Sequence, residues 1–185
     1  MKHLTTALLL AAAVAAAFAE QQLVPSQSEI VFTSRQMGVP VDGRFRTFDA
    51  QVAFDPKQPQ AAHIALGIDL ASVSIGTAEV EAELAKPEWF GVKQHPRATF
   101  ESTTVKPIGA NRFEVAGKLA IKGTTRDVIV PVTLAQAGGD TTATGMFVIK
   151  RQDFRIGDGE WNDTSLVAND VQVKFKLKLA GVPAL

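Results

Sequence analysis

The side chains that could do chemistry are few and scattered along the sequence. Cysteine is absent, and of the three histidines His3 falls in the N-terminal segment while His63 and His95 stand in different contexts. A metal site of the usual nitrogen and sulfur type therefore cannot be assembled from them. His95 precedes Pro96, and we interpret it as a loop residue whose polar atoms bond to the backbone.

Two acidic clusters could suggest paired carboxylates or a calcium site. On a helix Glu79 and Glu83 would share a face and Glu81 would not, which is typical of a solvated surface. Asp158 and Asp163 belong to a second cluster, whose spacing is not that of a known calcium loop. No serine of the mature chain lies in a nucleophile-elbow motif, and no glycine-rich phosphate loop is present. The sequence thus predicts no catalytic residue, no metal ligand and no enzyme.

Two pairs of oppositely charged residues could contact the polar head of a ligand. They are Arg126 with Asp127 and Arg151 with Asp153. The alternative is that they form ion pairs between neighbouring strands on the solvated face of a sheet, and we favour this interpretation.

The N-terminal segment indicates an exported chain. Lys2 precedes an apolar run over 7–17 and the sequence Ala17-Phe18-Ala19, which predicts a signal peptide of residues 1–19. The run is too short to span a membrane, so residues 20–185 are expected to form one periplasmic domain without a membrane span. The chain has 19 basic and 19 acidic residues, which argues against nucleic acid as a partner.

From Ser28 onward, apolar and polar residues alternate in a way typical of strands with one dry face. The separators are short and rich in turn-forming residues, so neighbouring strands should be antiparallel. Only 77–85 has helical spacing, with Thr77 as its cap and Pro87 after its end. The eight expected strands are 28–35, 43–54, 63–70, 98–105, 112–122, 127–134, 141–150 and 171–179.

Eight sequential antiparallel strands can form a sandwich or a closed barrel. Closure removes the exposed sheet edges. The predicted fold is therefore all-β: an eight-stranded antiparallel barrel with a short helix in the crossover between strands three and four. A barrel of this size can be filled by its own side chains or hold one small elongated ligand, and the periodicity leaves both open.

The run GKLAIKGTTRDVIVPVTL, at 117–134, resembles the motif of the YceI family, the polyisoprenoid-binding, lipocalin-like proteins. The stretch 88–102 is similar to the family's aromatic pair, its basic-x-x-Pro block and its T-F-x-S block. Segments 43–50 and 150–154 match further blocks in the same order, so the resemblance covers the mature chain. The sequence departs from the family pattern at Gln36, Glu81, Glu83 and Arg155.

The resemblance implies a lipocalin-like barrel that takes up the isoprenoid tail of a quinone or a similar long-chain amphiphile, with no catalytic cofactor. The partners expected are this lipid and, as a candidate, a membrane redox protein; the oligomeric state stays open. Two rival interpretations are a structural or partner-binding barrel with a filled core and a hydrolase acting on amphiphiles.

Strand parity and the aromatic crossover predict which side chains bind the ligand. Trp89 and Phe90 are expected at the barrel mouth, the alternative being a plug that completes the core. Gly117 and Ala98 should leave room in the lumen. The predicted ligand-binding residues are Ile30, Phe32, Ile64, Leu66, Ile68, Trp89, Phe90, Phe100, Phe113, Val115, Leu119, Val130, Val132 and Phe175.

Overall fold

The computed structural model describes residues 21–185, so the predicted signal peptide lies outside the described residues. Within this part, no helix is both long and apolar enough to cross a membrane. The helices are α1 (Ala78–Leu84) and the short 3-10 helices η1 (Pro25–Gln27), η2 (Pro59–Ala61), η3 (Leu70–Ser72), η4 (Arg151–Phe154) and η5 (Gly159–Asn162). The strands are β1 (Gln22–Leu23), β2 (Glu29–Gln36), β3 (Val39–Phe45), β4 (Phe48–Ala53), β5 (His63–Asp69), β6 (Val73–Ser74), β7 (Arg97–Gly109), β8 (Arg112–Ile121), β9 (Thr124–Ala137), β10 (Asp140–Lys150) and β11 (Asp170–Ala180).

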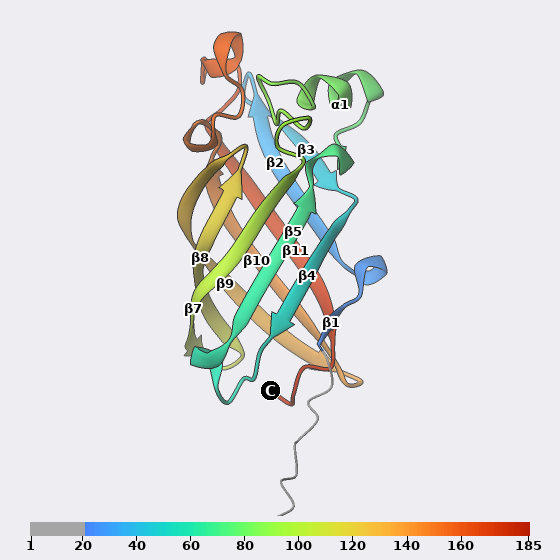
Figure 1. Cartoon of the computed structure of the whole chain (residues 1–185), viewed down its shortest axis with the longest axis vertical. Coiled ribbons are helices and arrows are strands. Elements are labelled where there is room, and N and C mark those ends of the chain that lie inside the picture. Colours follow the sequence, from blue (N-terminus) through green and yellow to red (C-terminus); the bar gives the residue numbers. More distant parts are fainter. Residues whose placement is uncertain (1–20) are drawn as a thin grey trace, which may run out of the picture.

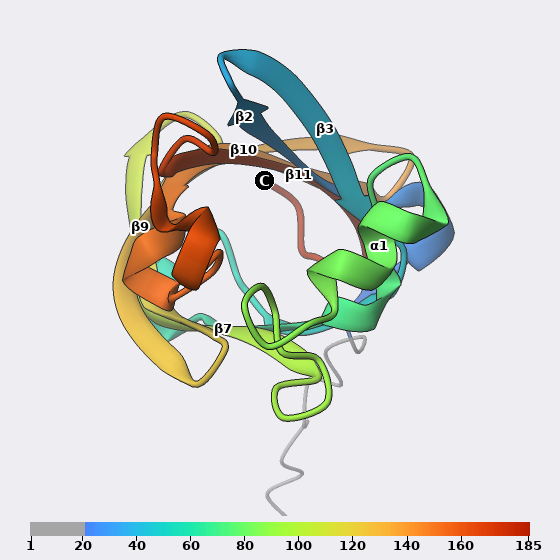
Figure 2. The same cartoon turned by 90° about the horizontal axis from the view of Figure 1, so that it is seen from above.

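The strands form a closed antiparallel barrel, as predicted (Figures 1 and 2). Strand β1 closes it, because Leu23 pairs with Leu179 of β11 and Gln22 pairs with Gln51 of β4. Strand β2 continues along β11 and pairs with β3, and β3 pairs with β6. The pairs β1 and β2, β3 and β4, and β5 and β6 each behave as one interrupted strand, which leaves eight strands around the barrel.

The single strand predicted over 43–54 is wrong, because the chain bends between β3 and β4. The backbone N–H of Arg46 donates to the carbonyl of Ser72, and that of Thr47 donates to the Ser72 hydroxyl. These bonds to η3 replace ladder bonds at the bend. The two-residue strand β1 was not predicted, since a strand this short has no readable alternation.

The long connections lie at one end of the barrel, the upper end in Figure 1. The segment between β6 and β7 carries α1, and the segment between β10 and β11 carries η4 and η5. The helix predicted over 77–85 is confirmed, and the Thr77 side chain accepts a hydrogen bond from the Val80 N–H at its start. Short turns and the C-terminus lie at the opposite, lower end.

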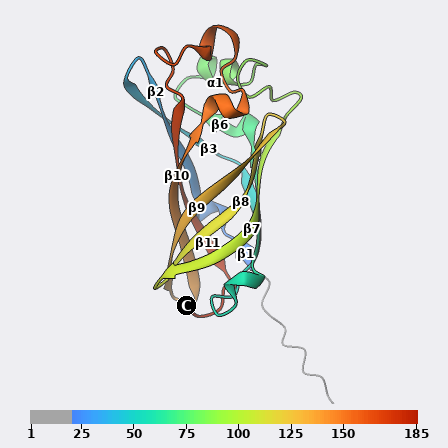
Figure 3. The same cartoon turned by 90° about the vertical axis from the view of Figure 1, so that its left-hand side faces the viewer.

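One seam of the barrel is only half closed. The ladder between β9 and β10 runs from Ala137 and Asp140 to Val132 and Gly145 and stops there. Above this point β9 continues beside β8 and β10 continues beside β11. The upper parts of β9 and β10 therefore diverge, as Figure 3 shows.

Candidate ligand-binding lumen

The lower chamber of the barrel is an apolar cavity of about 150 Å³. The Gln136 amide links two residues of its wall, because it donates to the Thr141 hydroxyl at 3.1 Å and to the carbonyl of Val182 at 3.2 Å. The rings of Phe54 and Phe113, which also line the chamber, meet edge to face with centroids 5.1 Å apart. The chamber is therefore the apolar lower end of the lumen.

The upper chamber is larger, at about 340 Å³, and lies beneath the long connections. Its wall includes Val80 and Leu84 of α1, so the apolar face predicted for that helix points into the lumen. The lower chamber exposes only apolar surface, although Thr99 and Thr141 lie in its wall. The upper chamber also exposes polar surface, and the polar and charged side chains in its wall are Ser34, Gln36, Glu83 and Arg151. The lumen is thus polar only towards its upper end.

The two chambers meet at a waist, which we define by the residues that line both of them. Ala98 is the smallest side chain of this ring and is 3 % exposed. Because the same side chains border both cavities, the chambers lie one above the other along the barrel, with the waist between them. This is not the filled core that the periodicity left open. The waist residues are Ile30, Ile68, Ala98, Leu119, Phe147 and Val173.

Glycines in neighbouring strands keep large aromatic rings out of the lumen. A Cβ atom at any of three wall glycines would overlap the ring of a phenylalanine beside it. Because glycine has no side chain, these rings lie flat against the wall, an arrangement known to offset glycine in sheets. The pairs are Phe32 with Gly43, Phe100 with Gly117, and Phe175 with Gly145.

The aromatic crossover forms part of the wall of the upper chamber. Trp89 and Phe90 are 7 % and 8 % exposed and both line this chamber. The Trp89 ring lies against Trp161, with centroids 5.4 Å apart, and the Phe90 ring lies 6.0 Å from Phe45. The indole N–H of Trp89 has no hydrogen-bond partner.

Arg151 is buried beneath the upper connections, so its predicted place on the solvated face is wrong. Its guanidinium is 1 % exposed and donates to five backbone carbonyls of the segment between β10 and β11. Burial lowers the pKa of Arg151, and Asp158 partly opposes this effect. The carbonyls belong to Ile156, Gly157, Trp161, Val167 and Ala168.

The register of β10 in the structure accounts for this burial. Phe147 and Ile149 point into the lumen, so Arg151 continues the inward-facing register by two residues. In the other predicted pair, Arg126 with Asp127, the prediction of a cross-strand ion pair is confirmed for Asp127, which lies 2.8 Å from Lys118.

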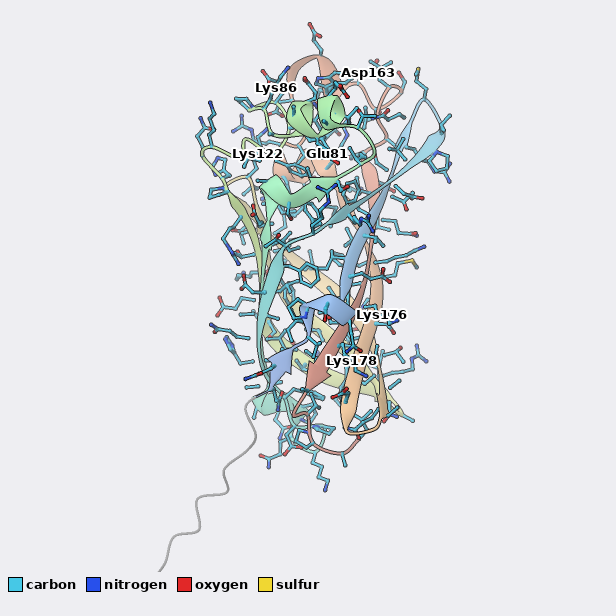
Figure 4. The ribbon with its side chains drawn as sticks, turned by 90° about the vertical axis from the view of Figure 1, so that its right-hand side faces the viewer. Glu81, Lys86, Lys122, Asp163, Lys176 and Lys178 are labelled. Carbon is cyan, nitrogen blue, oxygen red and sulfur yellow. The ribbon has the colours of Figure 1, made fainter. Side chains whose placement is uncertain are left out.

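Lys122 joins the two upper connections to each other. Its ammonium donates to the carbonyls of Glu88 and Arg155 and lies 3.6 Å from a carboxylate oxygen of Asp158. Burial lowers the pKa of Lys122, and Asp158 raises it by a smaller amount. Figure 4 shows Lys122 near the upper end of the barrel, together with Glu81, Lys86 and Asp163.

Every residue predicted to bind a ligand lines at least one of the two chambers. Phe32, Trp89 and Phe90 line the upper chamber alone, Ile30, Ile68 and Leu119 line both, and the others line the lower chamber alone. Contact with a ligand stays a prediction for all of them. The prediction missed Phe147 because Met146 to Ile149 are all apolar and hide the alternation, and it missed Val182 because it follows the last strand.

No group of three histidine, cysteine, aspartate or glutamate side chains gathers as a potential metal site within residues 21–185. The histidine predicted to lie in a loop, His95, does so, and its ring lies near Gly123 in the turn between β8 and β9.

The sequence of this chain is similar to that of known proteins. A family model described as "YceI-like domain" matches residues 21–179. A UPF0312 protein of Azotobacter vinelandii is 35% identical over 98 residues, which are 53% of this chain and 51% of that protein. A UPF0312 protein of Pseudomonas aeruginosa is 33% identical over 120 residues, 62% of each chain. The matched part therefore spans between about half and two thirds of these relatives.

Solved structures share the fold over more of the chain. BcnA of Burkholderia cenocepacia is 43% identical, with a TM-score of 0.82 over 85% of this chain and 99% of BcnA. A polyisoprenoid binding domain from Saccharophagus degradans has a TM-score of 0.73 over 88% of this chain and 98% of that domain. At 17% identity, this second likeness concerns the fold alone.

Proposed function

The chain belongs to the family of YceI-like domains, and we propose that it is a non-catalytic carrier that holds one long-chain amphiphile, such as an isoprenoid quinone, in its lumen. The observation that supports this proposal is the stacking of an apolar lower chamber beneath a larger and more polar upper chamber, with the waist residues lining both. A guest with a polar head and an apolar tail matches this gradient.

The hydrophobic effect supplies the driving force without any chemistry by the protein. Each methylene that moves from water into an apolar site gains about 0.8 kcal/mol. The apolar walls of both chambers, which have volumes of about 340 Å³ and 150 Å³, offer such a site to the tail of a guest.

The proposal includes export to the periplasm with cleavage after Ala19, leaving residues 20–185 as the working domain. The support is the sequence pattern of 1–19. A carrier in this compartment would exchange its lipid with a membrane, and a membrane redox protein is the candidate partner if the head is a quinone.

The test is to purify the folded protein from bacterial cells without detergent, extract it with organic solvent and identify the extract by mass spectrometry. We expect about one prenyl or acyl lipid for each protein molecule. Ala98→Leu, which narrows the waist, is the matched control and should carry less. A protein that unfolds cooperatively and yields no stoichiometric lipid would contradict the proposal.

A further inference from the structure

The outer face of the barrel carries exposed apolar side chains at the half-closed seam between β9 and β10 (Figure 3). Ile129 of β9 and Met146 and Val148 of β10 are 60 %, 48 % and 55 % exposed. Where the same two strands are paired, their exposed side chains include Thr133 and Thr144 instead. The large apolar side chains on this face therefore lie where the ladder is missing.

A proline stands at the point where the ladder stops. The last pair involves Gly145, and the next pair in the same register is Pro131 with Met146. The backbone N–H of Leu134 donates to the carbonyl of Asn111, on the β8 side of β9. Backbone groups alternate in direction along a strand, so those of Pro131 point toward β10. Proline has no N–H and cannot donate the next ladder bond to Met146.

The upper edges of β9 and β10 are not tied to each other. Over residues 21–185, neither a ladder pair nor a side-chain hydrogen bond nor an ion pair joins 126–131 to 146–150. The upper connections differ, because Lys122 links them through the carbonyls of Glu88 and Arg155. Parting the connections breaks the hydrogen bonds of Lys122, whereas parting the seam breaks no ladder pair.

The inner face of the seam belongs to the lumen. Phe147 lines both chambers, and Val130 lines the lower one. Side chains alternate across a strand, so these two lie behind Ile129, Met146 and Val148. The wall is thus apolar on both faces here, whereas an antiparallel sheet with one solvated face usually alternates apolar with polar residues. An apolar chain that crosses the seam contacts apolar side chains from the solvent to the waist.

The tail of a lipid fits this surface better than a strand of another protein does. An added strand takes its affinity from backbone hydrogen bonds to a free edge. Pro131 removes one donor from this edge, and a proline or a lysine at an edge discourages such pairing. Lys174 of β11 pairs with Met146 beside the seam. A hydrocarbon tail needs no hydrogen bond and matches the apolar side chains on both faces.

We propose that the tail of the guest enters the lumen sideways, between the upper parts of β9 and β10, and that Ile129, Met146 and Val148 form the surface that receives it. This inference rests on the proposed carrier function and adds the route by which the guest enters. The upper connections stay in place while the guest passes the seam.

A reversible bridge across the seam tests this route, because the chain has no cysteine of its own. Ile129→Cys with Val148→Cys places one thiol on each edge, and propane-1,3-diyl bismethanethiosulfonate bridges the two thiols. Thr133→Cys with Thr144→Cys is the matched control, since these two residues are already paired across the same strands. The uptake of retinol, a fluorescent isoprenoid alcohol, is followed by stopped-flow fluorescence.

The bridge should act on the rate of uptake and not on the affinity. We expect the bridge between 129 and 148 to slow retinol uptake at least about tenfold, because it holds the route closed. Dithiothreitol should restore the rate, and the control bridge should leave it unchanged. Affinity is measured at equilibrium by displacement of the apolar dye N-phenyl-1-naphthylamine. It should change by less than about twofold, since a closed route slows entry and release alike.

Pro131→Val gives a second test that needs no bridge. The new N–H can donate to the Met146 carbonyl and extend the ladder by one pair. The net contribution of one hydrogen bond corresponds to uptake that is slower by between about 2-fold and 10-fold. Pro107→Val is the matched control, because Pro107 is an exposed proline of β7, away from the seam, and this variant should keep the rate.

The outcomes separate this inference from the carrier function. If the bridged protein and Pro131→Val both take up retinol as fast as the unmodified protein does, the guest enters elsewhere. The inference is then wrong and the carrier function stands. If neither retinol nor the dye binds to the unmodified protein, the carrier function itself fails. Sedimentation checks a further occupant, since a dimer that the bridge abolishes would show that a second copy covers this surface and would overturn the inference.

Discussion

The ring of Phe32 on β2 lies directly over Gly43, the residue that pairs with it on β3. A glycine at this position lets the ring lie against the barrel wall instead of extending into the upper chamber. Phe175 lies in the same way over Gly145, its pairing partner, and the Phe100 ring lies over Gly117, which is diagonal to it across β7 and β8. The open lumen therefore depends on glycines that do not themselves line either chamber.

Gly43→Ala tests this dependence, because the three atoms nearest to the new Cβ all belong to the Phe32 ring, a side chain that can move. We expect the ring to turn into the upper chamber and dye affinity to fall at least about tenfold, or about 1.4 kcal/mol. Overpacking costs about 1–3 kcal/mol of stability, so cooperative unfolding should persist. Gly109→Ala is the matched control, since its Cβ meets only ordinary contacts. Equal dye binding by both variants would contradict the account.

Arg151→Met tests the role of the buried guanidinium in holding the upper connection. The change leaves five backbone carbonyls without their donor, and we expect the free energy of unfolding in urea to fall by about 3 kcal/mol or more. Arg155→Met, in the same segment with a side chain that is 73% exposed, should change it by less than about 0.5 kcal/mol. Similar losses in the two variants would refute this role.

The lowered pKa of Lys122 should make the free energy of unfolding rise at alkaline pH. Burial lowers its pKa in the folded protein, and unfolding restores the ordinary value of 10.5. Between these two pKa values the unfolded chain binds more protons, so this group makes the free energy of unfolding increase with pH. The free energy of unfolding in urea should be measured from pH 8 to 10.5. That of the unmodified protein should rise relative to that of Lys122→Met. If the free energy of unfolding of the unmodified protein falls relative to that of Lys122→Met over this range, the explanation is excluded.

The half-closed seam between β9 and β10 predicts uneven protection of backbone amides. Above Val132 and Gly145 the two strands are not paired with each other. Amides that face the seam at 126–130 and 146–149 should therefore exchange with deuterium faster than those at 133–136 and 141–145. Hydrogen exchange followed by mass spectrometry or NMR checks this, and uniform protection along both strands would show that the seam is closed in solution.

The alternation of apolar residues predicted most of the barrel because each strand has one dry face. On β11, Val173, Phe175 and Leu177 all line the lumen, as their parity required. The bend at Arg46 was not predictable, because it depends on hydrogen bonds to Ser72, which is distant in the sequence. Ser72 follows the strand expected over 63–70, and the sequence did not predict that it contacts another strand.

Which residues face the lumen was predictable, but how much space their side chains leave there was not. Parity places a side chain on the lumen side, but whether space remains there depends on contacts such as that of Phe175 with Gly145, which join separate strands. Arg151 was misjudged because a charged residue at a strand end is usually solvated, and only the fold supplies its five carbonyl partners.

The waist allows the most direct test of a continuous lumen. Isothermal titration with methyl alkyl ketones of increasing chain length should show an affinity that rises by about 0.8 kcal/mol per methylene until the lower chamber is full. In Ala98→Leu the rise should stop once the chain reaches the waist, while short ketones bind as before. An affinity that is independent of chain length in the unmodified protein, or the same rise in both proteins, would contradict a single lumen that passes Ala98.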